Sequence, residues 1–287
     1  MRASRTFLLT AQTALALIIV PTHAHAEPVP GPTDGVQPLE RAHAHNDYEH
    51  ERPLFDALSH GFRSVEADVW LVNGELCIGH DAPDCSRTLE SLYLEPLAEI
   101  AGANGGEIYD ESTEPLRLYV DVKDGGQAVW DVLADQLNDR PQLVSSWAND
   151  RETTRAVEVV VSGQLANQTF DDPVRWASGD GRIVTPPPAG ATSADLVVLS
   201  DNWTRLFTWQ GVGPMPEYER QKLHELVDRA HAGGYEVRFW AIPDTEPGAR
   251  EAVWRELVDA DVDQINTDHL TALEEFLKTH DPAEQNS

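Results

Sequence analysis

Strand-like and helix-like segments alternate along the chain after Arg41, and this alternation narrows the folds that the chain can adopt. Apolar runs rich in β-branched residues are typical of buried strands, and apolar residues three or four positions apart are typical of helices. Eight strand-like runs are expected, at residues 41–46, 64–72, 116–122, 142–147, 157–162, 195–200, 236–241 and 262–267. Helices are expected at residues 53–60, 89–100, 127–137, 216–232, 246–259 and 270–278. The pattern predicts an α/β fold, a single closed (β/α)8 TIM barrel.

The main alternative fold is an open, doubly wound sheet. No G-x-G-x-x-G follows the first strand-like run, so the dinucleotide-binding version of that fold lacks its motif. The tight turn Asn73-Gly74 leads into ELCIG (75–79), which we expect to extend the second strand as a hairpin. Residues 170–194 are rich in turn-forming residues, and no element is assigned to them.

The amino-terminal residues have the pattern of a signal peptide. Arg2 and Arg5 form a basic start, residues 7–20 are mostly apolar, and Ala24-His25-Ala26 provides a small-x-small cleavage site. An uncleaved anchor is the alternative. The expected organisation is a signal peptide at 1–26, a flexible lead-in at 27–38, the barrel domain at 39–280 and a polar tail at 281–287. We therefore expect an exported protein, secreted or periplasmic.

The chain is strongly acidic. It carries 49 acidic and 21 basic residues, a formal charge of −28. Such a surface repels phosphate backbones and anionic lipid surfaces, so nucleic acid is not an expected partner. No run after the signal is long and apolar enough to span a bilayer. We expect a monomer without stable membrane insertion whose partner is a small molecule.

Polar side chains fall at the carboxyl ends of the expected strands, which is where a barrel places its active site. They are His45 and Asn46 on the first strand, Glu66 and Asp68 on the second, Asp121 and Lys123 on the third, Trp240 on the seventh and Asp268 after the eighth. A random distribution of surface charge would not place them so regularly.

The carboxylates among these residues predict a metal site. Glu66 and Asp68 are two residues apart on one strand, so both point to the same face. Carboxylates at one site repel each other unless a cation lies between them, and Mg²⁺ or Ca²⁺ prefers such oxygen ligands. Asp121 supplies a third carboxylate on the neighbouring strand, and Lys123 faces the same way, where it suits a phosphate or an ion pair with the acids.

The histidines suit acid–base chemistry on a phosphodiester. One imidazole would attack or accept a proton and the other would protonate the leaving alkoxide. The candidates are His43, His45 and His80. The alternative is a zinc site built on His43 and His45, which would need two further histidines at later strand ends, and these are not found. Which of His43 and His45 is catalytic is left open.

The two cysteines flank one of these histidines. Cys77 and Cys85 are separated by seven residues that include His80 and Asp81. Export permits a disulfide, which would close a small loop around His80. A buried free Cys77 and an exposed free Cys85 are the alternative.

The motifs H-A-H-N-D-Y (43–48), E-A-D (66–68), G-H-D (79–81) and D-V-K (121–123) occur in this order. Together they resemble the superfamily of glycerophosphodiester phosphodiesterases and phosphatidylinositol-specific phospholipase C, in particular a branch with mitochondrial-inheritance proteins. LVSSW resembles its fourth strand, RFWAIP its seventh and INTDHL its eighth. The likeness covers nearly the whole mature chain and implies a TIM barrel.

The resemblance implies a role for each site residue. His45 and His80 would be the catalytic pair, and the carboxylates of Glu66, Asp68 and Asp121 would hold Mg²⁺ or Ca²⁺. Lys123 would contact phosphate, and Trp240, together with Asn46, would line the substrate mouth. The implied activity is that of a metal-dependent phosphoric diester hydrolase acting on a glycerophosphodiester or phospholipid headgroup.

The chain departs from the family pattern at its first motif. H-N-D replaces the usual H-R-G, and the carboxylate of the following E-N-T is absent, although Asp47 or Glu49 could compensate. The pairing of Asp121 with Lys123 and the cysteines around His80 are similar to the sphingomyelinase D branch, whose members form cyclic phosphates. A cyclising lyase and an inactive barrel that binds a phosphorylated ligand are therefore the alternatives to a hydrolase.

Overall fold

A computed structural model describes residues 31–110, 112–148, 151–164 and 172–284. The predicted signal peptide, the first four residues of the lead-in (27–30) and the last three residues of the tail lie outside the described residues. The segment that begins at Gly31 is one compact unit. Among the described residues, no helix has the length and apolar character needed to cross a membrane.

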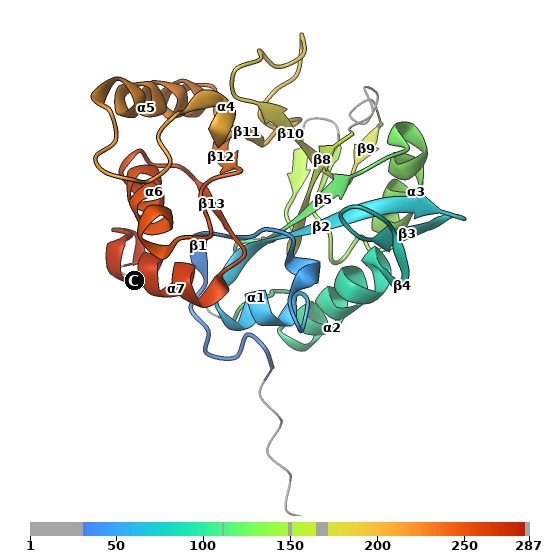
Figure 1. Cartoon of the computed structure of the whole chain (residues 1–287). Coiled ribbons are helices and arrows are strands. Elements are labelled where there is room, and N and C mark those ends of the chain that lie inside the picture. Colours follow the sequence, from blue (N-terminus) through green and yellow to red (C-terminus); the bar gives the residue numbers. More distant parts are fainter. Residues whose placement is uncertain (1–30, 111, 149–150, 165–171, 285–287) are drawn as a thin grey trace, which may run out of the picture. The chain divides into compact units, whose positions relative to one another are not determined.

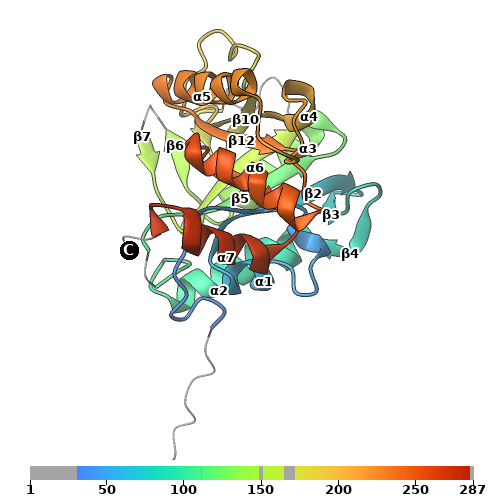
Figure 2. The ribbon, with the colours of Figure 1, turned by 60° about the vertical axis from the view of Figure 1, so that its left-hand side comes forward.

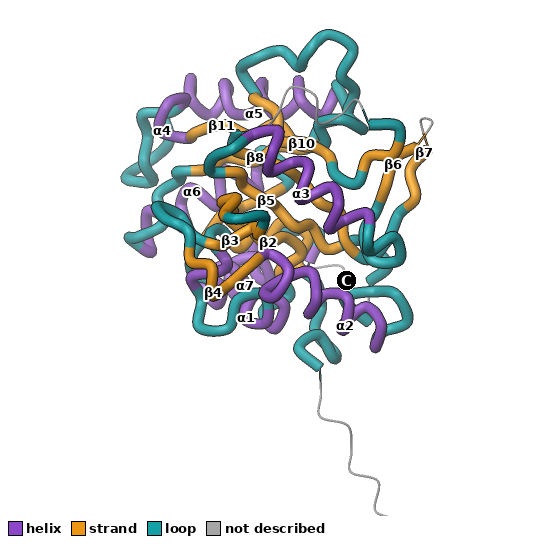
Figure 3. Tube along the Cα trace, turned by 90° about the vertical axis from the view of Figure 1, so that its right-hand side faces the viewer, coloured by secondary structure: helices purple, strands orange, loops and turns teal. Residues whose placement is uncertain are grey.

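The described chain forms the predicted closed barrel. Eight parallel strands follow one another around it: β1 (Leu39–Ala44), β2 (Phe62–Val72), β5 (Leu116–Val122), β8 (Val157–Gly163), β10 (Ser178–Arg182), β11 (Val198–Asn202), β12 (Glu236–Trp240) and β13 (Gln264–Thr267). The ring closes because β1 pairs with both β2 and β13. Helices lie outside the strands (Figures 1 and 3).

The helices follow the predicted segments closely. They are α1 (Phe55–Ser59), α2 (Glu95–Ala103), α3 (Gly126–Asn138), α4 (Trp203–Leu206), α5 (Glu217–Ala232), α6 (Pro247–Asp259) and α7 (Leu270–His280). Two short segments accompany them, the 3-10 turn η1 (Asp47–Glu49) and the π-helical turn η2 (Glu90–Leu94). α6 and α7 pack side by side on the outside of the barrel (Figure 2). The short α4 was not predicted.

Two strands of the barrel differ from the prediction. Residues 142–147 do not form the fourth strand: β6 (Ser146–Ala148) lies in a separate sheet with β7 (Arg151–Thr153) and β9 (Val174–Arg175). The fourth barrel strand is β8, and the fifth is β10, which comes from the unassigned segment. The sequence of β10, SGDGR, has no β-branched residue, and a Cβ at Gly181 would lie 2.6 Å from Leu199 Cδ2, so the Leu199 side chain would have to move.

The second strand carries a projecting hairpin. β2 continues past the barrel and pairs antiparallel with β3 (Glu75–Ile78), as predicted, and β3 pairs with the unpredicted β4 (Asp84–Thr88) (Figure 1). The predicted disulfide between Cys77 and Cys85 is confirmed. Along β2, Val65, Ala67 and Val69 are fully buried in the main hydrophobic core, and the carboxylates that alternate with them face the barrel interior.

Candidate active site

A cavity of about 270 Å³ opens at the carboxyl ends of the barrel strands. Its wall brings together side chains from six of the eight strands or from the loops that follow them. The lining residues are His45, Asn46, Glu66, His80, Asp121, Lys123, Ser162, Gly163, Asp180, Arg182, Arg238 and Trp240. Parallel strands bring their carboxyl ends to one rim, so motifs that lie far apart in the sequence meet here.

The three predicted carboxylates converge at this cavity. One oxygen from each of Glu66, Asp68 and Asp121 lies within 4.8 Å of the others. Asp68 is fully buried, and its Oδ1 has no hydrogen-bond partner among the described residues. Burial raises the pKa of Asp68, and Glu66 adds to the effect. A buried, unpartnered carboxylate oxygen beside two further carboxylates fits the oxygen donor set that Mg²⁺ or Ca²⁺ requires.

Glu66 is held as an anion by its neighbours. Burial opposes its ionisation, but the guanidinium of Arg238 and the ring of His43 outweigh burial and hold the pKa of Glu66 well below its usual range. Arg238 Nη1 donates a hydrogen bond of 2.9 Å to Glu66 Oε2. A fixed negative charge therefore faces the cavity from β2.

Lys123 bridges the other two carboxylates. Its Nζ lies 2.7 Å from Asp68 Oδ2 and 2.8 Å from Asp121 Oδ2. Burial alone would lower the pKa of Lys123, but the hydrogen bonds to Asp121 and Asp68 raise it. The lysine is therefore a permanent cation at the cavity wall, in the ion pair with the acids that was the predicted alternative to a phosphate contact.

His45 lies at the cavity with one ring nitrogen fixed. Its Nδ1 donates to Asp268 Oδ1 over 2.8 Å, and one third of the side chain is exposed. Partial burial opposes protonation, but the hydrogen bond to Asp268 and the charge of Glu66 outweigh it and raise the pKa of His45. Because a carboxylate can only accept, Nδ1 carries the proton, and Nε2 is left for a ligand.

His80 follows β3 of the projecting hairpin, and, as in His45, a carboxylate fixes its Nδ1. Its Nδ1 donates to Asp68 Oδ2 over 2.7 Å, and half of the side chain is exposed. Tyr48 donates to the same oxygen over 2.8 Å. The backbone beside the ring is fixed by a hydrogen bond of 2.7 Å from Trp70 Nε1 to Gly79 O, and by the disulfide around the loop.

His43 points into the same barrel but one layer deeper. It is fully buried and does not line the cavity. Its Nδ1 lies 2.6 Å from Ser64 Oγ, and its Nε2 lies 3.0 Å from Glu66 Oε2 and 2.9 Å from Arg238 Nη1. Burial, together with the charge of Arg238, lowers the pKa of His43 to about 4 against the effect of Glu66. His43 is therefore a neutral ring that supports Glu66 from below.

The remaining predicted residues divide between the cavity and the interior. Asn46 and the half-buried Trp240 line the cavity. Asn46 has a left-handed backbone (φ 47°), and its side-chain oxygen lies 3.0 Å from Tyr48 Oη. Asp47, considered as a replacement metal ligand, is fully buried and accepts instead from Leu54 N at 2.6 Å and Tyr93 Oη at 2.8 Å.

Five cavity residues were missed in the sequence: Ser162, Gly163, Asp180, Arg182 and Arg238. Arg238 lies on β12 between the buried Val237 and Phe239, so the alternation of polar and apolar residues in EVRFW places its side chain inside the barrel. That alternation was a usable signal. Asp180 and Arg182 belong to the strand that was not recognised.

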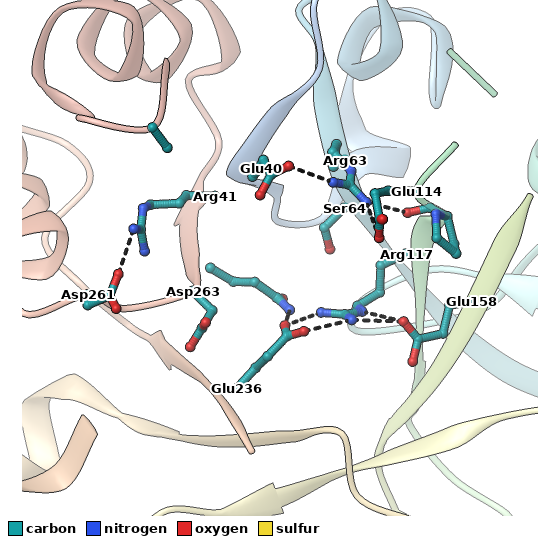
Figure 4. Close-up of a pocket in the computed structure, with 13 residues that line it drawn as sticks. Glu40, Arg41, Arg63, Ser64, Glu114, Arg117, Glu158, Glu236, Asp261 and Asp263 are labelled. Atoms are coloured by element: carbon teal, nitrogen blue, oxygen red, sulfur yellow. Dashed lines mark hydrogen bonds and ion pairs between the residues drawn. The ribbon is translucent and has the colours of Figure 1, made fainter. Parts of the chain in front are cut away.

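A second hollow lies at the opposite, amino-terminal rim of the barrel (Figure 4). Its centre is Arg117, which is bound to Glu236 on one side and to Glu158, at 2.8 Å, on the other. Arg63 donates to the carbonyl of Pro115 and pairs with Glu40. These side chains are paired with one another, so this hollow has the character of a structural ion-pair network.

Comparisons with known proteins agree with this geometry. The profile of the AIM6-like phosphodiesterase domain matches residues 32–174, and that of the glycerophosphoryl diester phosphodiesterase family matches residues 236–271. The chain is 31% identical to altered inheritance of mitochondria protein 6 of Eremothecium gossypii, over 85% of this chain and 71% of that protein. It is 27% identical to the homolog from Arthroderma benhamiae, over 84% and 85% of the two chains.

A solved structure supports the same fold. The crystal structure of a glycerophosphoryl diester phosphodiesterase from Parabacteroides distasonis superimposes with a TM-score of 0.50 at 13% identity, covering 86% of this chain and 88% of that one. At this identity the likeness concerns the fold alone. With the sequence matches it leads to one conclusion: the chain belongs to the AIM6-like family of glycerophosphodiester phosphodiesterase-type TIM barrels.

Proposed function

We propose that the protein is an exported, metal-dependent phosphoric diester hydrolase that acts on a glycerophosphodiester or a phospholipid headgroup. The observation that carries the proposal is the pair His45 and His80. Each ring is oriented by a carboxylate on Nδ1, and both line one cavity with Glu66, Asp121 and Lys123. Two oriented imidazoles can transfer the protons that phosphodiester cleavage requires, and the ammonium group of Lys123 beside them can bind the phosphate.

The two histidines would divide the proton transfers. His80 Nε2 would accept the proton of the attacking water as its oxygen bonds to phosphorus. His45, whose pKa is raised, would donate the proton that the leaving alkoxide takes up when its bond to phosphorus breaks. Lys123 would hold a non-bridging oxygen. A divalent cation held by Glu66, Asp68 and Asp121 would neutralise charge that develops on the phosphoryl oxygens.

Phosphorus NMR of the reaction products tests this proposal. The purified protein is incubated with glycerophosphodiesters and lysophospholipids, with and without EDTA. A phosphomonoester that appears only without EDTA is expected. His45→Ala and His80→Ala should each lower the rate at least about 100-fold. His224→Ala on the outer helix α5 is the matched control and should leave it unchanged. If no substrate is turned over, the hydrolase proposal is refuted, and an inactive barrel that binds a phosphorylated ligand is the alternative that is left.

A cyclising lyase of the sphingomyelinase D type is the second candidate. It is favoured by the disulfide that closes the loop around His80, the feature that the chain shares with that branch in the resemblance. In this reaction a hydroxyl of the substrate itself attacks phosphorus, so no water is consumed. The same spectra separate the two reactions, because the lyase yields a cyclic phosphate.

Export is proposed from the pattern of residues 1–26, and a disulfide is consistent with an oxidising compartment. Amino-terminal sequencing of the protein recovered from the culture medium or periplasm is expected to begin near Glu27. Recovery of the uncleaved chain from the membrane fraction would instead indicate an anchor.

A further inference from the structure

Arg182 is a cation of the cavity that the mechanism above does not use. It is the last residue of β10 and lines the cavity mouth, with 44% of its side chain exposed. Among the described residues its nearest carboxylate oxygen is Asp180 Oδ2, 3.7 Å away and beyond hydrogen-bond distance. Its hydrogen bonds are long ones to neutral acceptors, 3.3 Å to Ser200 Oγ and 3.4 Å to Gly181 O.

The other long cations of the cavity are engaged differently. Lys123 makes two ion pairs shorter than 3 Å and has 18% of its side chain exposed. Arg238 has 5% exposed and is bound to Glu66 at 2.9 Å. Compared with these two, Arg182 has the most exposed side chain and the longest ion pair. A guanidinium in this state can form two parallel charge-assisted hydrogen bonds with a carboxylate or phosphate at little cost.

The position of Arg182 in the ring sets which part of a substrate it meets. Starting from β1, the strand order places β10 fourth in either direction, so β10 lies opposite the strand that leads to His45. Glu66 and Asp68 come from β2, which adjoins β1, and Asp121 and Lys123 come from the β5 segment, midway between β1 and β10. A phosphorus atom held between the two histidines therefore leaves Arg182 facing a more distant group of the substrate.

We propose that Arg182 binds a second anionic group, a carboxylate or a phosphate carried on the alcohol beyond the scissile phosphate. This deepens the proposed function and rests on it for the placement of the scissile phosphate. The enzyme would accordingly prefer anionic headgroups to neutral or cationic ones. This preference runs against the negative charge of the whole chain, so the discrimination depends on this local cation.

Calorimetric titration with two matched ligand pairs tests the proposal. Glycerophosphoserine differs from glycerophosphoethanolamine by one carboxylate, and glycerophosphoinositol 4-phosphate differs from glycerophosphoinositol by one phosphate. The wild-type protein should bind the anionic member of at least one pair about tenfold more tightly, and the pair that shows it identifies the anionic group. Arg182→Gln should bring this ratio to about one, and Arg182→Lys should retain part of it.

Arg255→Gln, on the outer face of α6, is the matched control and should keep the wild-type ratio. An unchanged ratio in Arg182→Gln, equal affinities within both pairs in the wild type, or no binding of any ligand would overturn the proposal. The readout needs no turnover. If the protein discriminates between the ligands but yields no phosphorus product, the proposed hydrolase is refuted and the anion-binding role of Arg182 stands. If it turns over substrate but the affinity ratio does not depend on Arg182, the hydrolase stands and the role of Arg182 is refuted.

Discussion

Asp47 makes the stability of the fold depend on pH in a way that one substitution should remove. Its side chain is fully buried beside the loop that follows His45, and burial raises the pKa of Asp47 from 3.8 to about 7 despite hydrogen bonds from Leu54 and Tyr93. The folded state thus favours the protonated carboxyl. The contribution of Asp47 to the free energy of unfolding is greatest below its unfolded pKa of 3.8. This contribution falls as the pH rises toward 7 and is level above that pH.

The size of the effect follows from the interval between the two pKa values. Each pH unit in that interval costs about 1.4 kcal/mol. Between pH 5 and pH 8 the chain crosses about two of these units, so the wild type should lose about 3 kcal/mol through Asp47 alone. In Asp47→Asn the amide oxygen can still accept from both donors, and the group does not titrate.

Urea unfolding of both proteins at pH 5 and pH 8 measures the difference. The free energy of unfolding of Asp47→Asn minus that of the wild type should be about 3 kcal/mol more positive at pH 8 than at pH 5. Any constant cost of the new amide cancels in this comparison. Asp259→Asn, on the exposed face of α6, should show no such change. A difference that is the same at both pH values would refute the argument.

Three further perturbations have defined outcomes. Because Asp268 raises the pKa of His45, Asp268→Asn should lower that pKa and move the alkaline limb of the profile of kcat/KM against pH to lower pH. Cys85→Ser should lower the free energy of unfolding by about 2–3 kcal/mol in calorimetry, and a reducing agent should have the same effect on the wild type. Arg117→Met should lower stability by about 3 kcal/mol at neutral pH, because it leaves two glutamates without their cation, and part of this loss should return on acidification.

Strands with several β-branched residues were among the parts of the fold that could be predicted. VEVVVS and LRLYVDV have this composition, and both are barrel strands. β10 could not be found, because SGDGR owes its strand conformation to the neighbours that it pairs with and to the room its glycine leaves for Leu199. QLVSSW has a strand-like composition, yet only Val144 bridges to the barrel strand β8, and Ser146 and Trp147 pair in the side sheet.

The candidate site divides in the same way. Glu66 and Asp68 could be placed together because residues two apart on a strand share a face. The same rule placed His43 and His45 on one face but could not say which reaches the cavity, since depth along the barrel axis depends on strand stagger. Arg182 could not be anticipated without the strand that carries it.

Closure of the barrel by β1 and β13 has a consequence for when the site exists. The hydrogen bond that orients His45 joins residues 223 positions apart, and Asp268 directly follows the last strand. Contacts of such long sequence separation form late in folding, because a long loop must first be closed. A nascent or partly folded chain therefore carries every motif of the site without an oriented His45. Under the proposed mechanism, the acid–base pair would therefore be complete only after β1 and β13 have paired, so an unfolded chain would have no activity.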